Sequence, residues 1–305
     1  MDTRDIVGSS WRATASNPYW WGVALLCTLV VDRPLQFLYE SWFLRPRKGV
    51  FPALEELLPG GGSSRGFFAA ALLLALFLLA KALDYLGQLS LIGLTAGASQ
   101  GRPAGTLEQM RRGLRGMPAY VAAMIPLDLV RYFLLALPFL VWLTWRRFDP
   151  GLHAWCQYLL VVLFITCLSL PLYVAAGVYE ELAGRALAMD GVSVPRAWAA
   201  AWERGRRGKR EVFSAWIPTF LADLIAAAFL VAAGFAASYA SLLIRGDRGW
   251  AGGWRGIISD AVFVLLLLAV KSVLALARVF KSCVWTEAWL SPGMGKEGGH
   301  AGERG

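Results

Sequence analysis

The segment "SVPRAWAAAWERGRRGKREVF", Ser193 to Phe213, is basic, bears two tryptophans, and lies between two long apolar runs. Ser193 is of the type that caps helix N-termini, and Pro195 suits a first helical turn. The apolar residues that follow recur at helical spacing on one face: Val194, Ala197, Trp198, Ala201 and Trp202. This pattern predicts an amphipathic helix at a membrane surface.

The same segment carries basic residues that we expect to meet anionic lipid headgroups: Arg204, Arg206, Arg207, Lys209 and Arg210. Trp198 and Trp202 are then expected to face the acyl chains. A nucleic-acid arm is disfavoured, because the neighbouring apolar runs would hold both tryptophans against the bilayer. The predicted partners are therefore the lipid bilayer and its anionic headgroups, and no nucleic acid.

The composition of the whole chain also predicts a membrane protein. Its 305 residues are 57% hydrophobic and 17% charged, with a mean hydropathy of +0.51, whereas soluble domains are about 25% charged. The net charge of +9 fits arginine-rich cytoplasmic loops. The four cysteines and two histidines do not show ligand spacing, so we expect no metal and no cofactor.

Apolar runs long enough to span a bilayer predict an all-α, polytopic membrane helix bundle of about six transmembrane helices with cytoplasmic interfacial amphipathic helices. The predicted spans are 18–44, 67–98, 117–145, 155–188, 212–244 and 256–289. The first is interrupted by Asp32, Arg33 and Pro34. We expect one integral membrane domain over 1–290 and a disordered tail over 291–305.

The distribution of basic residues predicts the orientation of these spans. Six spans place seventeen lysines and arginines on the side of both termini and nine on the other side. Basic residues favour the cytoplasmic side of a membrane. We therefore expect a multi-pass protein of the cell (inner) membrane with both termini in the cytoplasm.

A threefold hairpin repeat is a further hypothesis, with units at about 5–98, 106–188 and 194–289. A second surface helix is predicted in "GTLEQMRRGLRGMPAYV", where Thr106 and Gln109 have capping-box spacing. Its apolar stripe comprises Leu107, Met110, Leu114 and Met117. A weaker third copy lies in "DIVGSSWRATASNPYWW". Chance similarity between apolar helices is the competing interpretation.

Six charged residues fall near the middle of the predicted spans, where charge is costly and usually paired. They form the candidate intramembrane polar network: Lys81, Asp84, Asp128, Arg131, Asp223 and Lys271. Three-residue spacing predicts the pairs Lys81–Asp84 and Asp128–Arg131, whereas Asp223 has no cation at that spacing. A neutral packing network is one interpretation, and a path for protons, ions or polar substrates is the other.

The segment "RALAMDGVSVPRAWAAAWERGRRGKREVF" resembles a pattern in uncharacterised bacterial six-span integral membrane proteins related to the membrane domain of glycerophosphodiester phosphodiesterases. The resemblance rests on Ala186, Asp190, Gly191, Ala197 and Trp202. It implies the architecture described above and no activity, because the catalytic domain of those enzymes is missing from this sequence.

Three classes of function follow from these patterns. We expect a non-enzymatic membrane protein that organises, assembles or regulates lipids or partner proteins. The alternative is a transporter or permease subunit that uses the mid-membrane charges, with an ATP-binding subunit as its partner. A membrane-embedded enzyme ranks third, because no catalytic constellation is visible in the sequence.

Overall fold

The computed structural model describes residues 3–28, 64–102, 105–145, 152–245 and 254–291, and this part of the chain is helical without a strand. The helices run in chain order as α1 (Thr3–Ser16), α2 (Tyr19–Leu26), α5 (Ser64–Ser99), α6 (Thr106–Trp145), α7 (Leu152–Asp190), α8 (Val194–Arg207), α9 (Lys209–Arg245) and α10 (Trp254–Leu290). The all-α class predicted from the sequence is therefore confirmed.

Four helices have the length and apolar composition to cross a membrane, which characterises the chain as a membrane protein. The candidate spans are Ala75–Ser99, Thr106–Leu134, Leu163–Asp190 and Lys209–Ala236. Of the predicted span 18–44, α2 covers Tyr19–Leu26. The remainder from residue 29 onward, including Asp32, lies outside the described residues, as does the predicted tail from residue 292.

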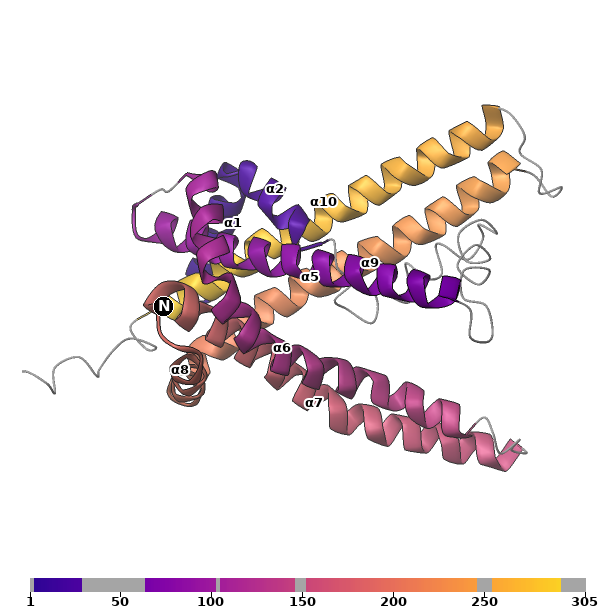
Figure 1. The fold of residues 1–305 in the computed structure, drawn as a ribbon, viewed down its shortest axis with the longest axis horizontal. Helices are drawn as coiled ribbons and strands as arrows, with labels where there is room; N and C mark the ends of the chain where they lie inside the picture. The colour runs from indigo at the N-terminus through magenta and orange to yellow at the C-terminus, as the bar shows by residue number, and fades with distance from the viewer. Residues whose placement is uncertain (1–2, 29–63, 103–104, 146–151, 246–253, 292–305) are drawn as a thin grey trace, which may run out of the picture.

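The long helices converge at one end and diverge toward the other (Figure 1). The main core lies at the converging end, beside α1 and α8, and includes Tyr120, Leu182 and Trp285. Toward the diverging end, large apolar side chains such as Phe164 and Leu265 are exposed. Exposed apolar shafts are expected where helices face acyl chains instead of water.

Each short or surface-lying helical segment packs on a long helix. The start of α6 packs on α5, where Gln109 lies over Gly93. Helix α8 packs on α7 through the buried Ala197 and Ala201. Helix α1 packs on α10, where Ser9 donates a 2.5 Å hydrogen bond to Glu287. Small or polar residues at these contacts allow close approach of the helix backbones.

The predicted surface helix at residue 106 does start there, but it continues into α6 without a break. The apolar stripe is not the face that packs on the protein, since Leu107 and Leu114 are exposed while Gln109 and Gly113 are buried. A Cβ on Gly113 would lie 2.9 Å from Oγ of Ser90. Because glycine has no Cβ, α6 can approach α5 closely at this position. Hydrophobicity alone does not indicate which face of α6 packs on α5.

Helix α8 begins at Val194, as the N-cap pattern predicts. Ser193 has the extended backbone of an N-cap, with φ −67° and ψ 158°, but its side chain does not cap the helix. The preceding helix α7 ends at Asp190, and Gly191 follows with a φ of 62°. This left-handed conformation is accessible to glycine at little cost and turns the chain from α7 into α8.

Candidate functional site

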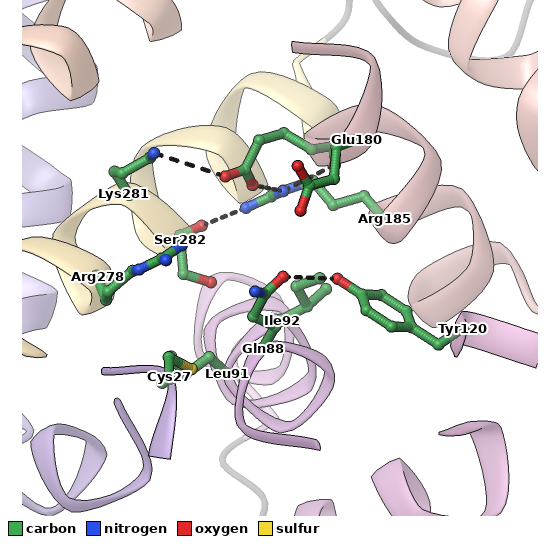
Figure 2. Close-up of a pocket in the computed structure, with 11 residues that line it drawn as sticks. Cys27, Gln88, Leu91, Ile92, Tyr120, Glu180, Arg185, Arg278, Lys281 and Ser282 are labelled. Carbon is green, nitrogen blue, oxygen red and sulfur yellow. Dashed lines mark hydrogen bonds and ion pairs between the residues drawn. The ribbon is translucent and has the colours of Figure 1, made fainter. Parts of the chain in front are cut away.

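The helices α5, α7 and α10 meet through polar side chains near the main core. The Thr95 and Thr286 hydroxyls lie 2.9 Å apart, and Nη2 of Arg185 donates to the carbonyl of Ser282 at 3.1 Å. Arg185 is 0% exposed. Figure 2 shows Arg185 reaching toward Ser282, while Tyr120 donates to Gln88 at 3.0 Å.

A small cavity of about 30 Å³ lies at this meeting point, and we call it the junction cavity. Its polar wall includes Gln88, Glu181 and Arg185. Nε of Arg185 is buried and has no hydrogen-bond partner among the described residues. A polar cavity of this volume can hold one water molecule, which would satisfy such a group.

A first charged cluster is formed by Lys81 with two aspartates, and we call it the buried triad. Nζ of Lys81 lies 3.3 Å from Asp84 and 3.0 Å from Asp128. The Tyr85 hydroxyl donates to Asp128, and the Gln88 amide donates to Asp84 at 3.1 Å. All three charged side chains are buried, and their contacts join α5 to α6.

Arg131 of α6 pairs with side chains of the neighbouring helix α7. Its guanidinium is ion-paired with Glu180 of α7 and donates to the Tyr173 hydroxyl at 3.0 Å. The sequence predicted an Asp128–Arg131 pair from their spacing. The ion pairs described for these residues join them to neighbouring helices, Asp128 to Lys81 of α5 and Arg131 to Glu180 of α7, and an Asp128–Arg131 contact stays a prediction. Lys81–Asp84, the other predicted pair, is present.

A second charged cluster links α7, α9 and α10, and we call it the Lys281 cluster. Nζ of Lys281 lies 3.2 Å from Asp223 and 3.8 Å from Glu181. Glu181 also accepts from Arg185 at 2.8 Å. The sequence indicated that Asp223 lacked a cation partner, and this is corrected here, because Lys281 reaches Asp223 from another helix.

A larger cavity of about 320 Å³ lies between the α6/α7 and α9/α10 hairpins, and we call it the lateral cleft. Its polar part is lined by Arg131, Tyr173, Glu180, Glu181, Asp223, Arg278 and Lys281. Its apolar part includes Leu170, Val174, Leu224, Leu230 and Leu274. The lateral cleft and the junction cavity share Glu180, Glu181, Arg278 and Lys281, so the two spaces are adjacent.

The six residues of the predicted network therefore lie in separate places. Lys81, Asp84 and Asp128 form the buried triad, whereas Arg131 and Asp223 line the lateral cleft. Lys271 is elsewhere and donates to the carbonyl of Thr28, just after α2, at 2.7 Å.

The membrane-surface residues predicted on and after α8 also divide. Trp202 is 68% exposed, whereas Trp198 is half-buried and its carbonyl accepts a 2.6 Å hydrogen bond from Tyr179. Arg206, Arg207, Lys209 and Arg210 are exposed. These positions leave the basic side chains accessible, and contact with lipid headgroups stays a prediction.

Arg204 differs from its neighbours, because it binds within the protein. Its guanidinium lies 3.1 Å from Asp190 and 3.6 Å from the ring centroid of Trp289. Burial lowers the pKa of Arg204, and the charge of Asp190 opposes that shift. The prediction that Arg204 meets headgroups is corrected: it holds α8 against the ends of α7 and α10.

Sequence reasoning missed the residues at the centre of the site. Arg185, Arg278 and Lys281 fall inside the predicted spans 155–188 and 256–289 but were not among the candidate residues, and they line the two cavities. Glu180 and Glu181 of the span 155–188 were not among the candidates either. A signal was present in the i, i+4 spacing of Glu181 and Arg185, which is a typical helical ion pair.

Within the described part of the chain, no group of three or more histidine, cysteine, aspartate or glutamate residues is arranged to hold a metal ion. No family model matches the sequence, and neither the curated proteins nor the solved structures gave a match. The resemblance to the six-span bacterial proteins therefore stays a prediction, and function is argued below from the geometry.

Proposed function

We propose that this chain is a non-enzymatic integral membrane protein that organises lipids by holding them between diverging hairpins. The observation that carries the proposal is the lateral cleft, whose apolar walls stay exposed on both sides. Leu170 of α7 is 57% exposed and Leu224 of α9 is 54% exposed. Apolar walls at membrane depth are covered by acyl chains or by partner helices.

The proposal includes six spans arranged as three hairpin units. Its support is the cyclic packing of the helices, because α6 begins against α5, α8 packs on α7, and α1 packs on α10. The long helices α5 and α7 each end near a glycine of positive φ, Gly101 at 65° and Gly191 at 62°. Repeated turns and repeated partners are typical of internal repeats.

The proposed location is the cell membrane, with both termini in the cytoplasm. Substituted cysteines test this orientation. An Arg206→Cys variant, on exposed α8, should resist an impermeant thiol reagent in intact cells, and an Arg147→Cys variant should react with it. The control is a chain in which Cys167, which is exposed, is replaced by serine. Labelling of Arg206→Cys from outside would contradict the orientation.

Photoreactive lipids test the lipid-holding geometry directly. In vesicles that contain a phospholipid with a photoreactive acyl chain, Leu170 and Leu224 should be labelled as strongly as Leu265, which lies on the exposed shaft of α10. Labelling of Leu265 alone would mean that the hairpins close on each other, and the organising role would lose its support.

The second candidate function is transport, and the shared lining of the two cavities favours it. Carboxylates and cations line both the lateral cleft and the junction cavity. Charged side chains at membrane depth often mark paths for protons or polar solutes. Vesicles containing the purified chain should carry ions or lipids across the bilayer if transport is the function. Transport by the chain, or by the chain with an ATP-binding partner, would favour this candidate.

A further inference from the structure

A third cavity, of about 510 Å³, lies where the ends of α5 and α7 meet the start of α6, and we call it the interface groove. The candidate spans of these helices end at Ser99 and Asp190 and begin at Thr106. The groove therefore lies at the level where acyl chains give way to headgroups in a bilayer. Among the described residues, no lining residue is shared with the lateral cleft or the junction cavity.

The lining of the interface groove changes from polar to apolar along the helices. Arg102 follows the end of α5, and Gln109 and Arg112 lie in the first two turns of α6. Leu89 of α5 and Ala119 of α6 line the groove farther from these ends. The volume falls in the range of ligand sites, which is about 300–1,000 Å³. The lining matches a ligand with a polar head at the span ends and an apolar body deeper in the bilayer.

Gln109 provides the observation that points to a bound ligand. Its side chain is 8% exposed and occupies the space that the missing Cβ of Gly93 leaves open. The amide lines the groove but forms no hydrogen bond with another described residue. An unpaired buried amide is costly, whereas a ligand in the groove can pair with its two donors or its acceptor.

Two arginines place cationic donors at the same end of the groove. The described lining contains Arg102 and Arg112 and no carboxylate. Arg102 is exposed and makes no ion pair with a described residue. Arg112 pairs with Glu108 on the same helix, but both side chains are more than half exposed, and such surface pairs contribute little. Guanidinium groups bind phosphate through two parallel hydrogen bonds, so a phosphate fits this end of the groove.

We propose that the interface groove binds one phospholipid, with its phosphate beside Arg102 and Arg112 and an oxygen of its head accepting from the Gln109 amide. A soluble phosphate offers the same oxygens. The level of the groove and its apolar end favour the lipid, whose acyl chains continue from Leu89 and Ala119 into the bilayer. The site is separate from the lateral cleft, so photolabelling of the cleft walls and phosphate recognition in the groove can fail independently.

The test is native mass spectrometry of the full chain in detergent, titrated with dioleoyl phosphatidylglycerol or with dioleoylglycerol, which has the same acyl chains and no phosphate. We expect phosphatidylglycerol to be retained about tenfold more strongly, the effect of one hydrogen bond to a charged group. Equal retention of the two lipids would overturn the assignment of a phosphate. Release of phosphatidylglycerol by an equal concentration of inorganic phosphate would show a soluble ligand and overturn the assignment of a lipid.

The variant Gln109→Met separates ligand binding from packing, because methionine keeps the length of the side chain and removes the amide. Phosphatidylglycerol retention should weaken about tenfold. The unfolding transition in sodium dodecyl sulfate should stay the same or move to a higher detergent fraction, since no side-chain hydrogen bond within the described protein is lost. Unchanged retention, with or without a loss of stability, would overturn the role of Gln109 and with it the proposal.

Matched variants locate the lipid. Arg102→Gln should weaken phosphatidylglycerol retention about tenfold, whereas Arg111→Gln should not, because Arg111 is exposed and does not line the groove. Ala119→Phe fills the apolar end and should also weaken retention, with the exposed Ala122, outside the groove lining, as the site of the control Ala122→Phe. Arg102→Gln changes an exposed residue and keeps the test decisive if Ala119→Phe fails to fold. Equal retention within either pair of folded variants would place the lipid elsewhere and overturn the proposal.

Discussion

The buried triad and the Lys281 cluster have the same composition, one lysine and two carboxylates, but different surroundings. Side-chain exposures in the triad are 9% for Lys81, 0% for Asp84 and 8% for Asp128. In the Lys281 cluster they are 16% for Lys281, 28% for Asp223 and 26% for Glu181. Clusters of equal charge are therefore closed off in one place and line an open cleft in the other.

The two clusters should differ most in the stability that is lost when the lysine of each is replaced. Lys81→Met removes the cation that lies within 3.3 Å of both Asp84 and Asp128 in a closed site, and breaking such a buried pair costs about 3–5 kcal/mol. Unfolding of the full chain in mixed micelles, titrated with sodium dodecyl sulfate, measures the change. The double variant Lys81→Met/Asp128→Asn should recover part of the lost stability, since one of the two carboxylates is then replaced by a neutral amide. A stable Lys81→Met variant would contradict the packing role.

The corresponding change in the second cluster should cost less. After Lys281→Met, Glu181 still binds Arg185, and Asp223 borders the lateral cleft, where water can reach it. We expect a loss of about 1–3 kcal/mol, the usual cost of one unmade polar contact. The same unfolding titration measures this loss, and Asp223→Asn in the Lys281→Met background corresponds to Asp128→Asn in the first cluster. A loss equal to that of Lys81→Met would abolish the distinction between the clusters.

Two arginines of α8, one partly buried and one exposed, should also differ in how much they stabilise the protein. Arg204→Ala removes the contacts to Asp190 and Trp289, and a partly desolvated cation–π contact is worth about 1–2 kcal/mol. Arg206→Ala changes an exposed residue and should stay within about 0.5 kcal/mol. Thermal unfolding in detergent measures both variants. Equal melting temperatures would show that Arg204 does not secure α8.

The smallest contrast concerns two tyrosines. Tyr85→Phe removes a hydrogen bond to Asp128 in the closed triad and should cost about 1 kcal/mol. Tyr173→Phe removes a bond from Arg131 beside the cleft, where water can replace the hydroxyl, and roughly half as much is expected. Unfolding titrations of the two variants, run in parallel, measure both losses of stability. A larger loss for Tyr173→Phe than for Tyr85→Phe would contradict this prediction.

The sequence predicted the helices better than it predicted their contacts. The start of α8 was predicted because Ser193, Pro195 and the apolar periodicity are local signals. The buried face was not predicted, since a membrane-surface helix meets water, lipid and protein, and hydrophobicity does not separate lipid from protein. Ala197 and Ala201 are buried because they are small, whereas the more apolar-looking Trp202 is exposed.

The charged site was predictable only in part, because the sequence indicates local pairs but not the pairs that helix packing creates. Lys81–Asp84 lie three residues apart on one helix, and their pairing is local. Asp223 and Lys281 are 58 residues apart, so only the packing of α9 on α10 brings them together. Arg185 falls inside the predicted span 155–188 but was not recognised as part of the site, because its contact to Ser282 joins residues 97 apart in the sequence.

The contact between α1 and α10 has a consequence for how the protein is made. A ribosome completes α1 long before it reaches α10, yet Thr14 of α1 meets Cys283, and Trp11 lies edge-on to Phe280. Helix α1 therefore emerges before the surface on which it will dock exists. Until α10 has been made, the face of α1 that carries Ile6, Ser10 and Thr14 has no α10 to dock on.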